Sequence, residues 1–497
     1  MGRRDAGHAP RRRGGRLVAV VLVLALGAGG AAAWRTGVLD DAAREVGDRL
    51  AALTGDPAPG PDDPSRVPPP DGLDLPDLDE PAPVAAEADP RALDRAAVRR
   101  ALAAALVDPG LGRHGVAAVA GLGDGAAGSA PVGLVARGRT PAAVPASTTK
   151  LLTAVGALSV LDPATTFETR VVRRGSTLTL VGGGDPFLAR TPAAAEGAAY
   201  PRRADVTTLA RRTAAALRGT GAAPLRLTYD ASLFTGPAVN PSWPADYVPD
   251  GVVAPISALW VDEGRPAGGV GRVADPAREA ADVFAAALRQ AGVAVQGRPR
   301  RAQAAVGADP VAEVSSAPLP EIVDQLLQVS DNEATEVLLR HVGLASGGEG
   351  SSAAGVAGVA EVLRDLGVPV PVRQLDGSGL SRENLIAPET LVGVLRAVGT
   401  SAEDSPLRAV LGGLPVAGFT GSLALRFDDV APDAVGGVRA KTGTLTGVSS
   451  LAGVAVDRRG TPLVFALMAD RIREVDTLDA RAALDRAAAA LAACTCS

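Results

Sequence analysis

Lysine is almost absent from this sequence. Of its 50 Lys and Arg residues, only Lys150 and Lys441 are lysine. Arginine cannot give up its proton in a protein, whereas lysine can when its pKa is lowered. Because arginine has taken every other basic position, we expect the two lysines to perform chemistry that arginine cannot.

Cysteine is also scarce and is confined to Cys494 and Cys496, among the last four residues. This count excludes a core held by several disulfides and a cysteine metal site. Cysteines two residues apart are poorly placed for a mutual disulfide, so we expect a frayed tail. Neither a metal nor a cofactor is expected.

Histidine occurs three times, as His8, His114 and His341. A Ser-His-Asp triad would have to use His114 or His341, and neither lies in a recognisable motif.

The net charge of −5 argues against nucleic acid as the main partner. The 497 residues, 47 % of them hydrophobic, suffice for two or three domains with a sizeable core.

Residues 1–36 predict an export signal. Six arginines lie among the first 16 residues, and 18 uncharged residues follow, from Leu17 to Trp34. This pattern is typical of a cleaved signal peptide or of an uncleaved signal anchor, and 18 residues are near the lower limit for a membrane span. We therefore expect the rest of the chain to work outside the cytoplasm, secreted or anchored to the cell membrane.

The remaining chain divides by composition. Residues 37–90 include a stretch rich in proline and acidic residues and predict an extended spacer. Residues 91–166 and 296–497 predict a catalytic domain, and residues 167–295, with short strand-like runs and many turns, predict a β-rich inserted domain or domains.

The expected elements favour the α+β class, with an antiparallel sheet flanked by helices and a helical subdomain. Strands are predicted at 116–122, 132–136, 438–445, 449–456 and 463–469, and helices at 91–106, 147–161, 319–328 and 478–493.

The first chemical motif is S-T-T-K, from Ser147 to Lys150. Residues i and i+3 at the start of a helix share a face, so the Ser147 hydroxyl and the Lys150 amine are expected to meet. A serine needs a base to become a good nucleophile, and lysine can serve if burial or a nearby cation lowers its pKa. Alone, the motif is also consistent with a helix-capping serine and a surface lysine.

The second motif is S-D-N, from Ser330 to Asn332. Ser330 could relay a proton between Lys150 and a leaving group, and the Asn332 amide could hold a substrate carbonyl. Such triplets also occur as ordinary turns at helix ends.

The third motif is K-T-G, from Lys441 to Gly443, in a strand-like segment. Lys441 would bring a second positive charge that keeps Lys150 neutral, and with Thr442 it could bind a substrate carboxylate. Gly443 would let a substrate approach the strand edge closely. The backbone N–H groups of Ser147 and Thr444 could form an oxyanion hole.

Together, and in this order, the motifs resemble those of penicillin-binding proteins and class A β-lactamases. The chain resembles in particular the class C low-molecular-mass penicillin-binding proteins of the D-alanyl-D-alanine carboxypeptidase/endopeptidase family. Further stretches that support this resemblance are G-G-G-D-P (182–186), A-P-I-S-A-L (254–259), D-G-S-G-L-S-R (376–382) and L-P-V-A-G (414–418).

The resemblance implies a penicillin-binding-protein/β-lactamase-like transpeptidase fold with an insertion. It implies peptidoglycan stem peptides ending in D-Ala-D-Ala as substrates, an acyl-enzyme on Ser147, and inhibition by β-lactams. The motifs do not distinguish carboxypeptidase from endopeptidase activity.

Two rival hypotheses are a β-lactamase-like hydrolase and a catalytically idle protein that binds the wall or senses β-lactams. A class A β-lactamase needs a carboxylate that activates water, and no clear E-x-x-L-N segment follows the second motif. An idle scaffold would be free to lose its lysines, yet these are present at the two motif positions.

Overall fold

The computed structural model describes residues 92–122, 131–137, 140–193, 199–218, 224–427 and 431–497. The predicted export signal at 1–36 and the spacer at 37–90 lie outside the described residues. Within the described part, no helix is both long enough and apolar enough to cross a membrane.

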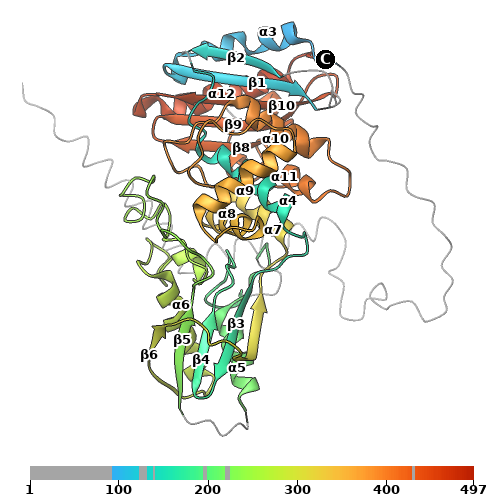
Figure 1. Cartoon of the computed structure of the whole chain (residues 1–497). Coiled ribbons are helices and arrows are strands. Elements are labelled where there is room, and N and C mark those ends of the chain that lie inside the picture. The colour runs from blue at the N-terminus through green and yellow to red at the C-terminus, as the bar shows by residue number, and fades with distance from the viewer. Residues whose placement is uncertain (1–91, 123–130, 138–139, 194–198, 219–223, 428–430) are drawn as a thin grey trace, which may run out of the picture. The chain divides into compact units, whose positions relative to one another are not determined.

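The first sheet has five strands in the order β2-β1-β10-β9-β8, and every neighbouring pair is antiparallel (Figure 1). Its strands come from both ends of the described chain: β1 (His114–Gly121), β2 (Val132–Arg137), β8 (Val438–Leu445), β9 (Val448–Val456) and β10 (Pro462–Asp470). β1 pairs with β10, so the first and last parts of the catalytic domain are joined directly.

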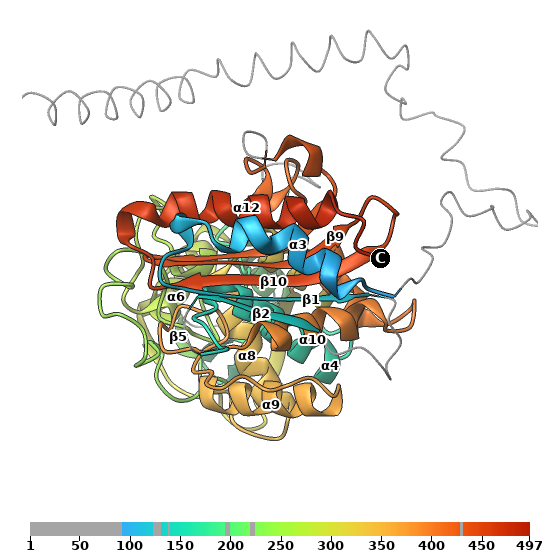
Figure 2. The same ribbon diagram turned by 90° about the horizontal axis from the view of Figure 1, so that it is seen from above.

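Helices cover both faces of this sheet. On one face, α3 (Arg95–Leu106) and α12 (Thr477–Ala492) lie side by side, as Figure 2 shows. On the other face lie α4 (Lys150–Val160) and α10 (Pro388–Gly399), together with the helical group α7 (Leu319–Val329), α8 (Asn332–Ala345) and α9 (Ser352–Asp365). Every residue of β1 is buried as a result. This is the predicted α+β arrangement.

The second sheet has the order β6-β5-β4-β3-β7. Its strands are β3 (Glu168–Arg174), β4 (Thr177–Val181), β5 (Leu225–Asp230), β6 (Val295–Arg301) and β7 (Asp309–Ser315). β5 is parallel to both β4 and β6, and the connecting helices α5 (Val206–Ala216) and α6 (Pro276–Gln290) pack on the sheet through a shared apolar core. The insertion predicted as β-rich thus has a five-stranded sheet and also contains two helices, α5 and α6.

The predicted boundary of the insertion at residue 295 falls at the first residue of β6. β6 and β7 both belong to the second sheet, which continues to Ser315. The arginine-rich sequence of β6 does not alternate apolar and polar residues, because β6 is an edge strand that is largely exposed. Its strand character therefore comes from pairing with β5 and is not visible in the sequence pattern.

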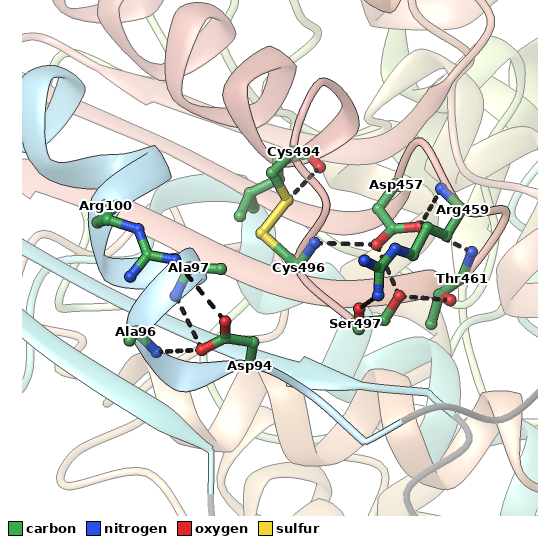
Figure 3. The surroundings of a disulfide bond; sticks show 11 residues. Asp94, Ala96, Ala97, Arg100, Asp457, Arg459, Thr461, Cys494, Cys496 and Ser497 are labelled. Atoms are coloured by element: carbon green, nitrogen blue, oxygen red, sulfur yellow. Dashed lines mark hydrogen bonds and ion pairs between the residues drawn. A yellow bond between two sulfur atoms is a disulfide. The ribbon is translucent and has the colours of Figure 1, made fainter.

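The prediction of a frayed C-terminal tail is wrong. Cys494 and Cys496 form a disulfide, with Cα atoms 5.3 Å apart, and Cys496 is fully buried in the core beneath α3 and α12. The Cys496 carbonyl accepts a hydrogen bond from the Asp94 N–H (2.7 Å), and the Asp457 carboxylate accepts bonds from Cys496 N and Ser497 Oγ (Figure 3). The burial of Cys496 and the hydrogen bonds of the tail are not visible in the spacing of the two cysteines.

Candidate active site

Ser147 lies in a short 3₁₀ turn, Ala146–Thr149, that leads directly into α4. The turn is entered through Ala146, whose φ of 47° is in the left-handed region that few non-glycine residues adopt. The Thr148 hydroxyl donates to the carbonyl of Pro145 (2.7 Å), which fixes the turn from within. Ser147 is thus held at the junction between the turn and the helix.

Lys150 is fully buried and its amine contacts three oxygens. Nζ lies 3.0 Å from Ser147 Oγ, 2.8 Å from Asn332 Oδ1 and 2.8 Å from the Ser378 carbonyl oxygen. The last two oxygens can only accept hydrogen bonds, so a neutral amine that donates to both has its lone pair left for the Ser147 hydroxyl. The geometry suits proton transfer from Ser147 to Lys150.

Burial is the main cause that lowers the pKa of Lys150, to about 8. The carboxylates of Asp331, Asp376, Glu336 and Glu333 oppose this effect and raise the pKa. The sequence suggested instead that the charge of Lys441 keeps Lys150 neutral. Here burial has that effect, and the surrounding carboxylates, to which the sequence had given no role, limit it.

Lys441 is the second fully buried lysine. Its amine donates to Ser330 Oγ (2.8 Å) and to the carbonyl oxygen of Thr442 (2.9 Å). Burial, and after it the charge of Lys150, hold the pKa of Lys441 well below its usual value. The electrostatic coupling of the two lysines is therefore present, but its clearest effect is on Lys441.

Ser330 ends α7 in the left-handed conformation (φ 60°), which turns the chain sharply before Asp331 caps the start of α8. This break places Ser330 beside Lys441, so its hydrogen-bond partner is Lys441 rather than Lys150. Asn332, at the first position of α8, contacts Lys150 instead. Its amide Nδ2 donates to the Val252 carbonyl (3.2 Å).

β8 is an edge strand, and the direction of its backbone groups can be inferred from their partners. The Ala440 N–H bonds outward to the Pro415 carbonyl, and outward direction repeats every second residue in a strand. The N–H groups of Thr442 and Thr444 therefore face the same outer edge, which supports the predicted place of Thr444 in an oxyanion hole.

Gly443 allows β8 to approach the serine turn closely. A Cβ atom at this position would lie 2.1 Å from Ser450 Oγ, 2.6 Å from the Pro145 carbonyl and 3.0 Å from Ser147 N. The sequence predicts that Gly443 makes room for the substrate. The structure shows that the protein's own turn already needs the space.

The K-T-G strand has a further polar neighbour that the motifs did not identify. The Thr442 hydroxyl lies 2.8 Å from Ser422 Oγ, in the short turn Gly421–Leu423. No spacing pattern in the sequence singles out Ser422. The neighbouring stretch L-P-V-A-G (414–418) pairs with β8 through Val416 and Arg439 and was the available signal.

Neither of the two histidines considered for a triad serves Ser147. His114 Nδ1 bonds to Asp470 Oδ1 (2.6 Å) and its Nε2 to the Thr140 carbonyl (2.9 Å). His341 stacks on Phe167, and burial lowers its pKa to about 4. Both rings are occupied in structural contacts.

Comparison with known proteins agrees with this geometry. Residues 98–270 and 265–491 match the model of the D-Ala-D-Ala carboxypeptidase 3 (S13) family. The chain belongs to this family. It is 33 % identical to carboxypeptidase DacB of Mycolicibacterium smegmatis over 488 residues, which cover 96 % of each chain. It is 36 % identical to carboxypeptidase Rv3627c of Mycobacterium tuberculosis over 366 residues, covering 71 % of this chain and 76 % of that protein.

Among solved structures, penicillin binding protein 4 (dacB) from Haemophilus influenzae has the same fold. Its TM-score is 0.63 at 21 % sequence identity, and the match covers 79 % of this chain and 97 % of that one. The predicted family and fold are thereby confirmed, and the protein is a serine peptidase of the S13 family.

Within this S13 protein, the structure brings the three motifs together. Lys150 is in direct hydrogen-bond contact with both Ser147 and Asn332, and Ser330 and Lys441 form a second contact pair. The main contact missed from the sequence is that of the Ser378 carbonyl, in the D-G-S-G-L-S-R stretch, with Lys150. That stretch was recognised as a family feature, but its backbone contact could not be read from side-chain types.

Proposed function

We propose that this protein is a serine-type D-Ala-D-Ala carboxypeptidase that trims peptidoglycan stem peptides through an acyl-enzyme on Ser147. The observation that carries the proposal is the 3.0 Å contact between Ser147 Oγ and the buried amine of Lys150, whose pKa is lowered to about 8. A lysine in this state can remove the serine proton near neutral pH. Membership of the S13 family supports the substrate class.

In the acylation step, Lys150 takes the proton of Ser147, and Oγ bonds to the carbonyl carbon of the penultimate D-alanine. The negative charge that develops on the carbonyl oxygen is stabilised by the N–H groups of Ser147 and Thr444. Gly443 lets these two segments lie close together, as one oxygen shared by both N–H groups requires.

The departing D-alanine needs a proton on its nitrogen as the peptide C–N bond breaks. Ser330 supplies it and regains one from Lys441, since its hydroxyl already accepts a hydrogen bond from that amine. Water then hydrolyses the acyl-enzyme, Lys150 returns its proton to Ser147, and the proton released by the water restores the pair of Ser330 and Lys441.

The terminal carboxylate of the substrate is held at Thr442, with Lys441 behind it and the Ser422 hydroxyl beside it. A carboxylate at this position would favour the protonated form of Lys441, because an opposite charge raises the pKa of an amine. β-Lactams carry a comparable carboxylate and a reactive amide, so they acylate Ser147 and inhibit the enzyme.

The first test is labelling with a fluorescent penicillin. A stable adduct that is lost in Ser147→Ala and kept in the matched control Ser401→Ala would support the proposal. Release of the label within about a second would favour a β-lactamase. Absence of any adduct would favour an idle wall-binding or sensor protein and would contradict the proposed activity.

The second test uses purified muropeptides and mass analysis. Loss of one alanine from pentapeptides is the expected carboxypeptidase product, and cleavage of cross-linked dimers would add endopeptidase activity. If wild-type protein leaves both substrates unchanged while binding penicillin, the proposed substrate class is wrong.

We also propose that the enzyme works outside the cytoplasm, because residues 1–36 have the pattern of an export signal and peptidoglycan lies outside the cell membrane. The measurement is cell fractionation combined with mass analysis of the mature N-terminus. Recovery from the membrane with residues 17–34 intact indicates an anchor, and recovery as a shortened soluble form indicates a cleaved signal. Recovery only from the cytoplasm would contradict the proposal.

A further inference from the structure

Glu336 connects α8 to the carbonyl that holds Lys150. It lies one helical turn after Asn332, on the same face of α8, and is fully buried. Its Oε1 accepts hydrogen bonds from the N–H groups of Gly377 (3.0 Å) and Ser378 (2.8 Å). The Ser378 carbonyl in turn accepts from Lys150. One face of α8 thus reaches Lys150 directly through Asn332 and indirectly through Glu336.

The backbone held by Glu336 has little freedom to move. A Cβ atom at Gly377 would lie 2.9 Å from Thr153 Oγ1 and 3.0 Å from Leu339 Cβ, so the segment is wedged between α4 and α8. The Thr153 hydroxyl also donates to the Gly377 carbonyl (2.9 Å). A small change at Glu336 would therefore be transmitted to the Ser378 carbonyl rather than absorbed locally.

Packing alone does not explain why this residue is an acid. Glu336 Oε2 is buried and has no hydrogen-bond partner among the described residues. Arg340, one turn further along α8, donates to the carbonyls of Thr235 and Pro237 instead. A neutral amide of the same shape would accept both backbone N–H groups without a buried charge, which is costly to desolvate. The two backbone hydrogen bonds therefore do not by themselves require a charge at this position.

We propose that Glu336 is a positioning residue for the reaction: it fixes the Ser378 carbonyl against Lys150 and places a negative charge beside that amine. The inference rests on the proposed roles of Ser147 and Lys150. When Lys150 accepts the serine proton, it becomes an ammonium ion in a buried site, and the carboxylate stabilises that ion. Glu336 thereby helps to set the pH range in which Lys150 is a competent base.

Other charged groups share this environment. Asp331, Asp376 and Glu333 also raise the pKa of Lys150. Burial and the neighbouring Asp376 raise the pKa of Glu336 to about 7, and Arg340 lowers it. Above that pH the carboxylate is ionised, so its charge is present where Lys150 titrates.

The test measures the rate of Ser147 acylation by a fluorescent penicillin from pH 5 to 10. Glu336→Gln keeps an oxygen acceptor for both N–H groups but removes the charge. In this variant the rising, acid side of the curve of acylation rate against pH should move to lower pH, by about half a unit or more. The reason is that a carboxylate that raises the pKa of Lys150 is gone. Glu336→Ala also loses the acceptor and should be slowed about a hundredfold. The matched control is Glu361→Gln, an exposed acid on α9.

A purely structural role would slow Glu336→Ala but leave the acid side of the Glu336→Gln curve where the wild type has it, and that result would overturn the inference. If Glu336→Ala does not fold, Glu336→Gln alone decides. If the wild type is not labelled at Ser147 at all, the proposed function fails first. If it is labelled and both variants match the control, only the inference about Glu336 fails.

Discussion

The two lysines are both fully buried, but they contact different partners. Lys150 lies against Ser147, Asn332 and the Ser378 carbonyl, whereas Lys441 lies against Ser330 and its own strand. These contacts are consistent with the proposed mechanism, in which Lys150 removes the proton of Ser147 and Lys441 resupplies Ser330.

Lys150→Arg is expected to abolish acylation. Arginine keeps the positive charge but cannot act as a base, so the rate should fall by about a thousandfold or more. Labelling with fluorescent penicillin measures the rate, and circular dichroism checks the fold. Near-normal labelling of a folded Lys150→Arg variant would show that another group is the base.

Lys441→Arg is expected to be milder than Lys150→Arg, because arginine keeps the positive charge. The substitution should still slow the reaction, since Lys441 is fully buried, its amine meets Ser330 Oγ at 2.8 Å, and a larger guanidinium group would have to displace its neighbours. We expect at least a tenfold slower acylation in this variant, measured in the same assay. A rate equal to that of the wild type would show that only the positive charge at this position matters.

The pH dependence of acylation follows from the lowered pKa of Lys150. The neutral amine is the active form, so the rate should rise about tenfold per pH unit below the pKa of about 8 and level off above it. The free energy of unfolding changes with pH in the same direction. The Lys150 amine binds its proton more tightly in the unfolded chain than in the folded one, so the contribution of Lys150 to stability grows as pH rises from about 8 to 10.5. Stopped-flow acylation across this range checks the prediction, and a rate independent of pH would contradict it.

Among the secondary-structure elements, the close approach of β8 to the turn Ala146–Thr149 builds the site. β8 brings Lys441 and Thr444, and the turn brings Ser147, so the distance between the two elements determines whether an oxyanion hole exists. Ser450 on the neighbouring β9 helps to hold them together, since its hydroxyl donates to the Pro145 carbonyl.

Gly443→Ala tests this approach. The added methyl group would lie 2.1 Å from Ser450 Oγ and 2.6 Å from the Pro145 carbonyl, so β8 and the turn must separate. A displacement of that kind should slow acylation about a hundredfold. Gly412→Ala is the matched control, because a Cβ there meets nothing within 4 Å. Equal acylation rates in the two variants would show that the close contact is not needed.

In the molecule as a whole, the beginning and end of the described catalytic domain are tied together. β1 pairs with β10, α3 packs beside α12, and the C-terminal tail bonds to Asp94 at the start of α3. Asp457, in the turn between β9 and β10, organises this junction. Its two carboxylate oxygens accept bonds from Arg459 N, Thr461 N, Cys496 N and Ser497 Oγ, as seen in part in Figure 3.

Asp457→Ala is expected to lower the free energy of unfolding by about 2 kcal/mol, because it leaves several buried donors without an acceptor. The site is remote from the motifs, so penicillin labelling per folded molecule should stay unchanged. Denaturant unfolding followed by circular dichroism measures the first quantity, with the exposed Asp365→Ala on α9 as control. An unchanged unfolding midpoint would show that the tail does not contribute to stability.

Much of the catalytic domain was predictable because its signals are local. The strand at 438–445 has the bounds of β8, the terminal helix is displaced by one residue at each end, and the hairpin of β1 and β2 was expected. The helix predicted from residue 91 begins at Arg95 in the structure, because the Asp94 side chain caps the N–H groups of Ala96 and Ala97. The end of the insertion was misplaced because edge strands such as β6 are defined by their partners.

The sequence by itself determined the chemistry: which serine, which two lysines and which motif order, since these depend on residue types and short spacings. Only the tertiary structure decided how that chemistry is tuned. The burial of Lys150, its contact with the Ser378 carbonyl and the carboxylate of Glu336 come from segments far apart in the chain. A pKa depends on desolvation and on charges nearby in space, and neither is encoded in spacing along the sequence.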